Sequence, residues 1–439
     1  MKRAVAACFA LVAGALAAQA AEPQQVTTLT FHDAMARAVA VNNSVERARA
    51  DVGIAEANRQ QLLSNVLPRI TATGTTQRNS ESVSFRNGDQ STTVLAQNDW
   101  NYRVTMSQPI FAGRRELRAY SQAKIGVQNA QIGVGGTEDA VLLRVASNFL
   151  AAVNAGSRMA IEQRNIEIAQ KRRGQASAFY QAGESTKVDV LRADTAIKAA
   201  QRLLAVAQQS REDAISRLRV DLDLDGAIDV VSPDHPLPSL PDESALVTRA
   251  EESRPDVDIA RNNLQVARLE VQKQRGFWLP TVTFNGGFIN QKSQFPAPRY
   301  AFGALNFNVP ILQSGEVEAR VAAAREREIQ AKLDLESTQV DAREDVRNAF
   351  TALREAETSL GLAKEQLAAA EAEYSQVFEL YRAQEATSLD VASSEASLAE
   401  ARRAVNEETL NRDLAELRVW YASGAIRQAV NVTSGAVQQ

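Results

Sequence analysis

One stretch of the sequence occurs twice, and this duplication restricts the possible folds more than any other feature. Residues 179–191 read FYQAGESTKVDVL, and residues 380–391 read LYRAQEATSLDV. Both copies place a tyrosine before an Asp-Val pair at the same spacing, and equivalent residues such as Asp189 and Asp390 are 201 residues apart. A tandem duplication is the simplest explanation.

Long runs rich in Ala, Gln, Glu and Arg flank both copies and contain no proline. Because these residues favour helices, each copy is predicted to be the turn between two long helices. The predicted helices cover residues 114–179, 185–221, 315–381 and 387–421. At 1.5 Å per residue, the longer ones would each span roughly 100 Å.

The two turns differ at a position that matters for ending a helix. In the first copy, Gly183 can adopt the left-handed conformation that ends a helix, and Ser185 or Thr186 can cap the next one. In the second copy, Gln384 stands where the glycine was. We therefore expect this helix end to be built differently.

The first 20 residues have the features of a secretory signal peptide. Lys2 and Arg3 precede an apolar run, which ends in an A-x-A cleavage site at residues 18–20. The apolar run before Cys8 is too short for a lipoprotein signal, and cleavage would remove this single cysteine. The exported chain would then be stabilised by packing or assembly rather than by disulfides.

Charge and hydropathy restrict the possible partners. The formal net charge is −4, and nothing in the sequence indicates nucleic-acid binding. After the signal peptide, no segment approaches 18 consecutive apolar residues, so no membrane-spanning helix is predicted. A membrane role would have to use β-strands.

Two further amphipathic helical runs cover residues 29–66 and 245–279, and each ends just before a proline, Pro68 or Pro280. These prolines are 212 residues apart. Two unrelated amphipathic helices would not be expected to share a run length that ends at a proline. The runs are therefore interpreted as matched copies.

Each of these prolines is followed by a predicted β-hairpin. Apolar and polar residues alternate strictly from Trp100 to Ser107, as in a strand with one apolar face. This strand would pair with residues 70–76 across a polar loop around residues 87–89. In the second half, the alternation recurs in residues 281–288 and 305–309.

The hairpins are expected to end at Pro109 and Pro310, which are again 201 residues apart. With Pro68 and Pro280 they make four predicted strand–helix transition prolines. The change of interval from 212 to 201 places an 11-residue length difference in an exposed hairpin tip. Strands of about 10 residues can cross an outer membrane when tilted. The alternative is a soluble β-subdomain that packs against its own helices.

The predicted fold is mainly α with a membrane β-barrel portion, internally duplicated, with four β-strands per chain. Four strands cannot close a barrel, and open edges in lipid leave backbone groups unpaired. Chains must therefore associate, most simply as a cyclic oligomer. We divide the chain into a signal peptide (1–20), a first repeat (21–232), a Pro-rich linker (233–242), a second repeat (243–424) and a loose C-terminal tail (425–439).

The two-fold repeat, the order helix–proline–hairpin–proline–long helix, and the paired Asp-Val turns together resemble the TolC-type outer-membrane efflux channel family. The resemblance covers essentially the whole mature chain. It implies a homotrimer with a twelve-stranded barrel in the outer membrane and an α-helical barrel in the periplasm. It also implies that the helix turns form the periplasmic tip and dock a periplasmic adaptor (membrane fusion protein), which connects to an inner-membrane pump of the ABC, RND or MFS type.

The resemblance also assigns roles in a periplasmic gate. Asp390 corresponds to an aspartate that forms a ring around the constricted tip, and Ser393 stands where the family has a second aspartate. Tyr381 corresponds to a tyrosine that bonds the carboxylate matching Asp189, while Ala386 replaces a supporting arginine. The alternative for both aspartates is a solvated charge at a helix start, favoured by the helix dipole.

The remaining turn residues are assigned by the resemblance to adaptor docking. They are Gly183, Ser185, Thr186, Val190, Leu191, Gln384, Thr387, Ser388, Leu389 and Val391.

No chemistry for catalysis, metals or cofactors is predicted. The two histidines, His32 and His235, are far apart, and the sequence has no P-loop, G-x-S-x-G or H-E-x-x-H motif. The main prediction is a passive exit duct of a tripartite efflux or type I secretion system. The alternative is a secreted periplasmic helical scaffold or coiled-coil interaction protein, which would leave the matched prolines and hairpins unexplained. A periplasmic adaptor would show one helical hairpin, not two complete copies.

Overall fold

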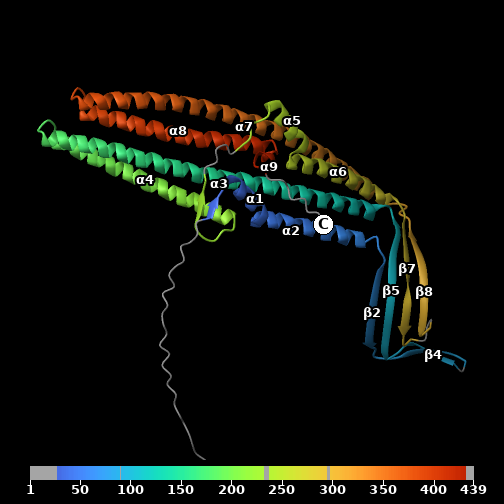
Figure 1. The fold of residues 1–439 in the computed structure, drawn as a ribbon. Coiled ribbons are helices and arrows are strands. Elements are labelled where there is room, and N and C mark those ends of the chain that lie inside the picture. Colours follow the sequence, from blue (N-terminus) through green and yellow to red (C-terminus); the bar gives the residue numbers. More distant parts are fainter. Residues whose placement is uncertain (1–26, 89, 232–236, 294–296, 432–439) are drawn as a thin grey trace, which may run out of the picture.

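The computed structural model describes residues 27–88, 90–231, 237–293 and 297–431 (Figure 1). The predicted signal peptide, part of the Pro-rich linker with His235, and residues 432–439 lie outside the described residues.

Two helical hairpins of equal size form the long body of the molecule. They are α3 (Arg115–Gln181) with α4 (Lys187–Asp221), and α7 (Glu316–Arg382) with α8 (Ser388–Ala422). Helices α3 and α7 have 67 residues each, and α4 and α8 have 35 each. All four pairs of ends keep the predicted interval of 201 residues. Helix α3 packs against both α4 and α8, so the hairpins lie side by side (Figure 1).

The helix predicted over residues 29–66 is in fact two helices, α1 (Phe31–Val41) and α2 (Asn43–Ser64). Asn42 has an extended backbone and ends α1, and its side chain accepts a hydrogen bond from the Ser44 N–H at 3.0 Å. The prediction of one continuous helix is wrong because this asparagine acts as an N-cap.

The matching run in the second half is broken at the equivalent place. It consists of α5 (Glu243–Ser253), α6 (Pro255–Arg275) and the 3-10 turn η1 (Gly276–Trp278). Pro255 has no N–H to donate, so it is suited to the first position of a helix rather than its interior. Arg254, which takes the extended conformation between the two helices, is 212 residues from Asn42.

Four antiparallel strands form one sheet in the order β2-β5-β7-β8. They are β2 (Arg69–Arg78), β5 (Asn98–Ala112), β7 (Thr281–Gln291) and β8 (Arg299–Asn308). Strands β2 and β5 form the first predicted hairpin, β7 and β8 form the second, and the β5–β7 ladder joins them. The sheet projects from one end of the helical body (Figure 1).

Strand β5 runs past Pro109 to Ala112, so the prediction that the hairpin ends at Pro109 is wrong. Pro109 lies opposite Thr283, next to an irregularity of the ladder before Phe111. A bulge tolerates a residue without an N–H. The other transition prolines flank strands: Pro68 and Pro280 directly precede β2 and β7, and Pro310 follows β8.

The predicted polar loop between β2 and β5 contains a small hairpin of its own, β3 (Val83–Asn87) with β4 (Gln90–Leu95). Matched residues are 212 apart in β2 and β7 but 201 apart in β5 and β8. The 11-residue difference therefore lies where this hairpin stands. A parallel pair of short strands, β1 (Thr27–Leu29) and β6 (Ile228–Val230), was also not predicted.

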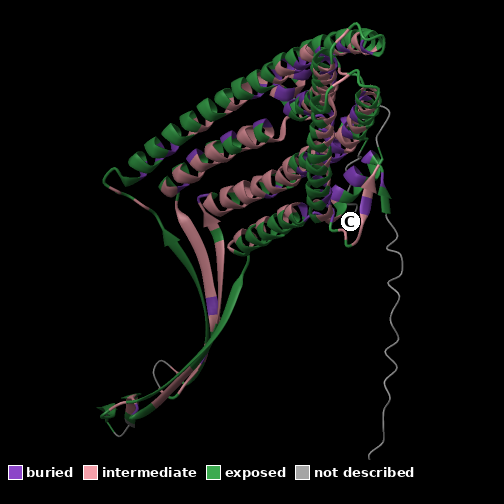
Figure 2. Ribbon diagram, turned by 90° about the vertical axis from the view of Figure 1, so that its left-hand side faces the viewer, coloured by how far each residue is buried: buried purple, intermediate pink, exposed green. Residues whose placement is uncertain are grey.

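The main core lies where α1, α3, α4 and the C-terminal segment meet. Its fully buried side chains include Phe149, Met35, Leu218, Leu222 and Ile426. Buried residues gather in this region, whereas the strands are mostly exposed or intermediate (Figure 2). Over 18 residues, α3 is long and apolar enough by composition to cross a membrane, but its valines and leucines there are core residues.

The C-terminal tail is not loose at its start. Helix α9 (Ile426–Ala429) packs into the main core, with Ile426 fully buried and Val430 nearly so. The prediction of a loose tail from residue 425 is therefore wrong up to residue 431. The apolar side chains of this segment are covered by α3 and α8.

Candidate functional site at the helix turns

The two copies of the repeated motif form the α3–α4 and α7–α8 turns, at the end of the helical body far from the sheet (Figure 1). In each turn, one residue donates its N–H to the third residue before it, and the next donates to the fifth before it. The bonds are Gly183 to Tyr180 (3.1 Å), Glu184 to Phe179 (2.9 Å), Gln384 to Tyr381 (3.0 Å) and Glu385 to Leu380 (2.8 Å). This pair of bonds is the Schellman motif.

Both turns use a left-handed residue at the same position, with φ of +80° at Gly183 and +64° at Gln384. The expectation that the second turn is built differently is therefore wrong. A residue with a Cβ pays about 1–2 kcal/mol for this conformation, which glycine avoids.

Each returning helix begins with a capping box. Asp390 donates its N–H to the Thr387 hydroxyl (3.2 Å), and its carboxylate accepts from the Thr387 N–H (2.9 Å) and hydroxyl (2.7 Å). Asp189 accepts from the Thr186 N–H (3.2 Å) and hydroxyl (2.9 Å) in the same way. Thr186, not Ser185, is thus the cap.

Hydrogen bonding keeps both aspartates ionised at neutral pH. Asp390 is fully exposed, and the hydrogen bond from the Thr387 side chain lowers its pKa. Burial raises the pKa of Asp189, but hydrogen bonds from Thr186 and Ser388 and the charge of Arg192 outweigh it, so the pKa is lowered. The two carboxylates therefore carry negative charge while they cap their helices.

Contacts between the two turns hold the two repeats together. The Gln384 amide donates to the Glu184 carboxylate. The rings of Phe179 and Tyr381 meet edge to face, with centroids 5.4 Å apart and an interplanar angle of 73°. With the Ser388 hydrogen bond to the first capping carboxylate, the second turn is fixed to the first within one chain.

Tyr381 does not make the bond that the resemblance implied. Its side chain is 5% exposed, and its hydroxyl has no hydrogen-bond partner among the described residues. Burial raises its pKa, the negative charge of Asp189 raises it further, and Arg172 opposes this. The Asp189 carboxylate instead bonds its own cap and Ser388, so the expected tyrosine–carboxylate lock is absent within the chain.

The predicted docking residues differ in how accessible they are. The exposed ones are Gly183, Thr186, Leu191, Gln384, Thr387 and Leu389, and the half-buried ones are Ser185, Val190 and Ser388. Val391 is fully buried, so it supports the turn from inside and offers no docking surface. Ser393 is exposed, and Ala386 is half-buried.

Two ion pairs behind the turns were missed by the sequence analysis. Arg172 of α3 binds Glu395 of α8 at 3.0 Å, and both side chains are at most 10% exposed. Burial raises the pKa of Glu395, which Arg172 partly opposes. Farther along, Arg403 lies 3.5 Å from the fully buried Glu162. These pairs join the two repeats.

The sequence did contain a signal for the first of these pairs. Arg172 lies three and four residues from the buried Ala169 and Ala176. A charged residue on such an apolar stripe points into the helix packing, where it requires a partner.

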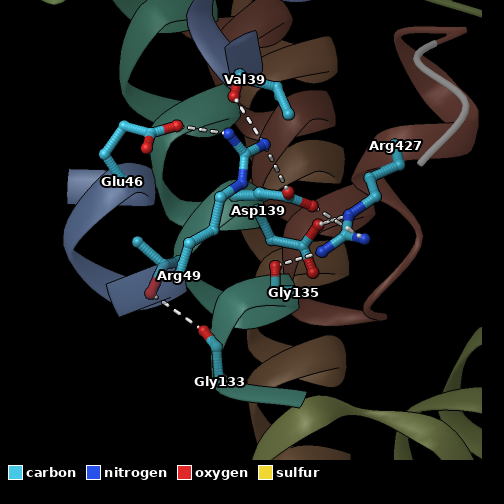
Figure 3. Close-up of polar contacts among 9 residues, drawn as sticks. Val39, Glu46, Arg49, Gly133, Gly135, Asp139 and Arg427 are labelled. Atoms are coloured by element: carbon cyan, nitrogen blue, oxygen red, sulfur yellow. Dashed lines mark hydrogen bonds and ion pairs between the residues drawn. The ribbon is translucent and has the colours of Figure 1, made fainter. Parts of the chain in front are cut away.

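A second polar cluster ties the C-terminal segment to α3 (Figure 3). Arg427 of α9 donates from Nε to the Asp139 carboxylate at 2.7 Å, reaches Glu138 at 3.2 Å, and bonds the Gly135 carbonyl. Arg49 of α2 approaches Glu138 from the other side at 3.8 Å. Both carboxylates are about nine-tenths buried.

Within the residues that the structure describes, no group of three or more His, Cys, Asp or Glu side chains is arranged to hold a metal ion.

Comparisons with known proteins agree on one family. The sequence matches the family described as "Outer membrane efflux protein" over residues 34–221 and 246–425, one segment in each repeat. Over 401 residues it is 22% identical to the outer membrane efflux protein BepC of Brucella suis biovar 1 (strain 1330), covering 89% of this chain and 85% of BepC.

Solved structures share the fold. The open state of the Neisseria gonorrhoeae MtrE outer membrane channel aligns with a TM-score of 0.74 and 19% identity, covering 91% of this chain and 90% of MtrE. The outer membrane protein VceC of Vibrio cholerae aligns with a TM-score of 0.73 and 16% identity, covering 90% of this chain and 96% of VceC.

Proposed function

The chain belongs to the outer membrane efflux protein family and is an outer-membrane exit duct of efflux systems with a periplasmic helical portion, and we propose that it forms this duct as a homotrimer. Membership confirms the resemblance to TolC-type channels. In this proposal, three sheets close one twelve-stranded barrel in the outer membrane. The long helices of the three chains continue it as a tube through the periplasm.

The observation that carries the proposal is a four-stranded sheet with two open edges and an apolar face. In the described part of the chain, β2 and β8 each pair on one side only. Ile70 and Phe307, on these two strands, are 67% and 69% exposed. Unpaired backbone groups in hydrocarbon cost several kcal/mol each, so association that pairs the edges is strongly favoured.

The two turns would then form the periplasmic gate. Three exposed, ionised Asp390 carboxylates around one axis repel one another and attract cations. Ser393, one helical turn later, adds no charge. Asp189 and Tyr381 are engaged within the chain, which supports a role for both in shaping the turn.

The proposed partners are a periplasmic adaptor and an inner-membrane pump of the ABC, RND or MFS type, in an efflux or type I secretion system. Leu191 and Leu389 support docking at the turns, because they are 54% and 61% exposed at the starts of α4 and α8. The duct itself needs no cofactor in this proposal, since the pump supplies the energy.

The mass of the detergent-extracted protein from isolated outer membranes tests the assembly. Light scattering corrected for bound detergent should give three chains per particle. A soluble monomer in the periplasm would contradict the proposal and favour the helical scaffold.

Single-channel recording tests the gate. Asp390→Ala should weaken block by divalent cations, because the ring of carboxylates is removed. Asp194→Ala, on the exposed side of α4, is the matched control and should leave the block unchanged. A block that persists in Asp390→Ala would exclude Asp390 from the gate.

A further inference from the structure

The register of the sheet separates its residues into two faces, because residues directly opposite one another in a ladder point to the same side. Tyr102 and Val104 of β5 lie opposite Gly74 and Ala72 of β2, and Val104 lies opposite Phe288 of β7. This face is apolar and suits lipid. The other face carries the alternate residues of each strand.

Arg103 stands in the middle of that other, polar face. It lies opposite Thr73 on β2 and Ile289 on β7, and Ile289 lies opposite Tyr300 on β8. The neighbouring rows of this face contain Thr75, Asn101 and Gln291 on one side, and Thr71, Thr105, Gly287 and Phe302 on the other. None of these residues is acidic.

The charge of Arg103 is not balanced within the described strands. Its Nε donates to the Asn101 side-chain oxygen at 3.4 Å, and no carboxylate of the described residues lies within ion-pair distance. The one acidic residue of this face in the four strands is Asp99, which accepts the Trp100 N–H at 2.9 Å. An exposed, unbalanced arginine on a solvent-facing surface attracts anions.

We propose that Arg103 of each chain places a ring of positive charge inside the barrel, where it favours anionic solutes at the exit of the duct. This inference rests on the proposed trimeric barrel. The duct would then carry charge of opposite sign at its two ends, with carboxylates at the periplasmic turns and guanidinium groups in the outer membrane. Cations would be attracted at the entrance, and anions would be favoured at the exit.

The size of the effect follows from Coulomb's law. Three charges about 10 Å from the axis, in water with 0.1 M salt, still give about a twofold enrichment of anions and a matching depletion of cations. The ratio of anion to cation concentration at Arg103 should therefore be about fourfold higher than without it. Salt at 1 M should remove most of the difference, because the screening length falls to about 3 Å.

A local chemical probe measures this potential without depending on the gate. Cys8, the single cysteine, belongs to the predicted signal peptide, so Asn101→Cys introduces a unique thiol on the polar face, about 7 Å along the strand from Arg103. Its reaction rates with a negatively and a positively charged thiosulfonate are measured from the outside of intact cells. The ratio of the two rates should fall about fourfold when Arg103→Gln is added.

Two variants control the comparison. Arg299→Gln removes an equal charge from the apolar face, since Arg299 lies opposite Asn290 and Asn290 lies opposite Tyr102. It should leave the ratio unchanged. Arg103→Lys keeps the charge and should keep the ratio, which excludes an effect of altered packing. Each variant is first shown to be trimeric by light scattering.

The outcomes separate the inference from the proposed barrel. If Asn101→Cys reacts and Val104→Cys does not, the polar face lines an aqueous lumen. An unchanged ratio in Arg103→Gln would then overturn the anion preference alone. If Val104→Cys reacts as fast as Asn101→Cys, the sheet does not separate lipid from lumen, and both the barrel and the inference fail.

Discussion

At the scale of single residues, the two copies of the motif have the same sequence pattern but different environments. Tyr180 is 47% exposed, whereas its counterpart Tyr381 is 5% exposed. The difference arises because the second turn packs on Phe179 of the first, and nothing equivalent covers the first tyrosine in the described chain. A duplication shows which positions correspond, but it does not show which copy covers the other. The burial of Tyr381 could therefore not be predicted.

Replacing Tyr381 by phenylalanine tests its environment. A buried hydroxyl without a partner costs about 1–3 kcal/mol, so Tyr381→Phe should leave the thermal unfolding midpoint unchanged or raise it. Circular dichroism of the purified protein measures the midpoint. Phe179→Ala, which removes the ring contact, should lower it. A lower midpoint for Tyr381→Phe would show that the hydroxyl has a partner in the assembly.

The capping threonine should control when Asp390 loses its charge. The Thr387 hydroxyl is the main cause of the lowered pKa of Asp390, so Thr387→Val should return this pKa toward its usual value of about 3.9. A lowered pKa stabilises the folded state above the unfolded pKa, and this stability is lost as pH falls through the folded pKa. In the variant, the charge is lost at a higher pH.

Divalent block in single-channel recordings, measured as the pH is lowered, detects this shift. The block should disappear at a higher pH in Thr387→Val than in the wild type. Thr186→Val removes the equivalent hydroxyl from Asp189 and should leave the pH dependence of the block unchanged. Identical pH dependence in Thr387→Val and the wild type would contradict the assignment of the block to Asp390.

At the scale of elements, both long hairpins depend on a left-handed residue at the turn. Valine at position 183, where φ is +80°, should cost about 1–2 kcal/mol and distort the turn. We expect Gly183→Val to impair export of a fluorescent substrate while trimers persist, because the strain lies far from the sheet. Gln384→Gly relaxes the equivalent position but loses the Glu184 contact, so a defect there would identify the contact as the important feature. Normal export by Gly183→Val would remove the turn from the functional site.

The sequence predicted the elements well where a single rule determines them. The long helices were predicted to within two residues of their ends, because proline-free runs and paired turns define them. Errors occurred where a local signal was overruled by a longer pattern. Asn42 and Pro255 are ordinary helix-start signals inside runs whose amphipathic pattern continues, and Pro109 stands inside a strand that a bulge prolongs.

At the scale of the whole molecule, the duplication predicted the architecture but not the contacts that join its parts. The ion pairs of Arg172 and Arg427 connect residues 223 and 288 positions apart in the sequence. Neither pair has an equivalent in the other repeat that could have suggested it. Such contacts depend on how the two hairpins lie against each other, and one sequence without relatives does not contain that information.

The last prediction concerns the link between the C-terminal segment and the centre of the molecule. Arg427 is the nearest cation to both Glu138 and Asp139, whose side chains are 10% exposed. Removing one partner of a buried pair leaves a charge without compensation, so Arg427→Ala should destabilise the protein by about 3 kcal/mol. Arg382→Ala, which breaks an exposed pair at the turn, should cost about 0.5 kcal/mol or less.

The pH dependence distinguishes lost charge from lost packing. Burial raises the pKa of Asp139, and Arg427 partly opposes this. A carboxyl group with a raised pKa disfavours the folded state increasingly as pH rises from its unfolded to its folded pKa. Without Arg427 the pKa rises further, so the variant should lose more stability at about pH 7 than at about pH 4. Denaturant midpoints at the two pH values measure this, and equal losses at both would assign the effect to packing of the arginine stem against α3.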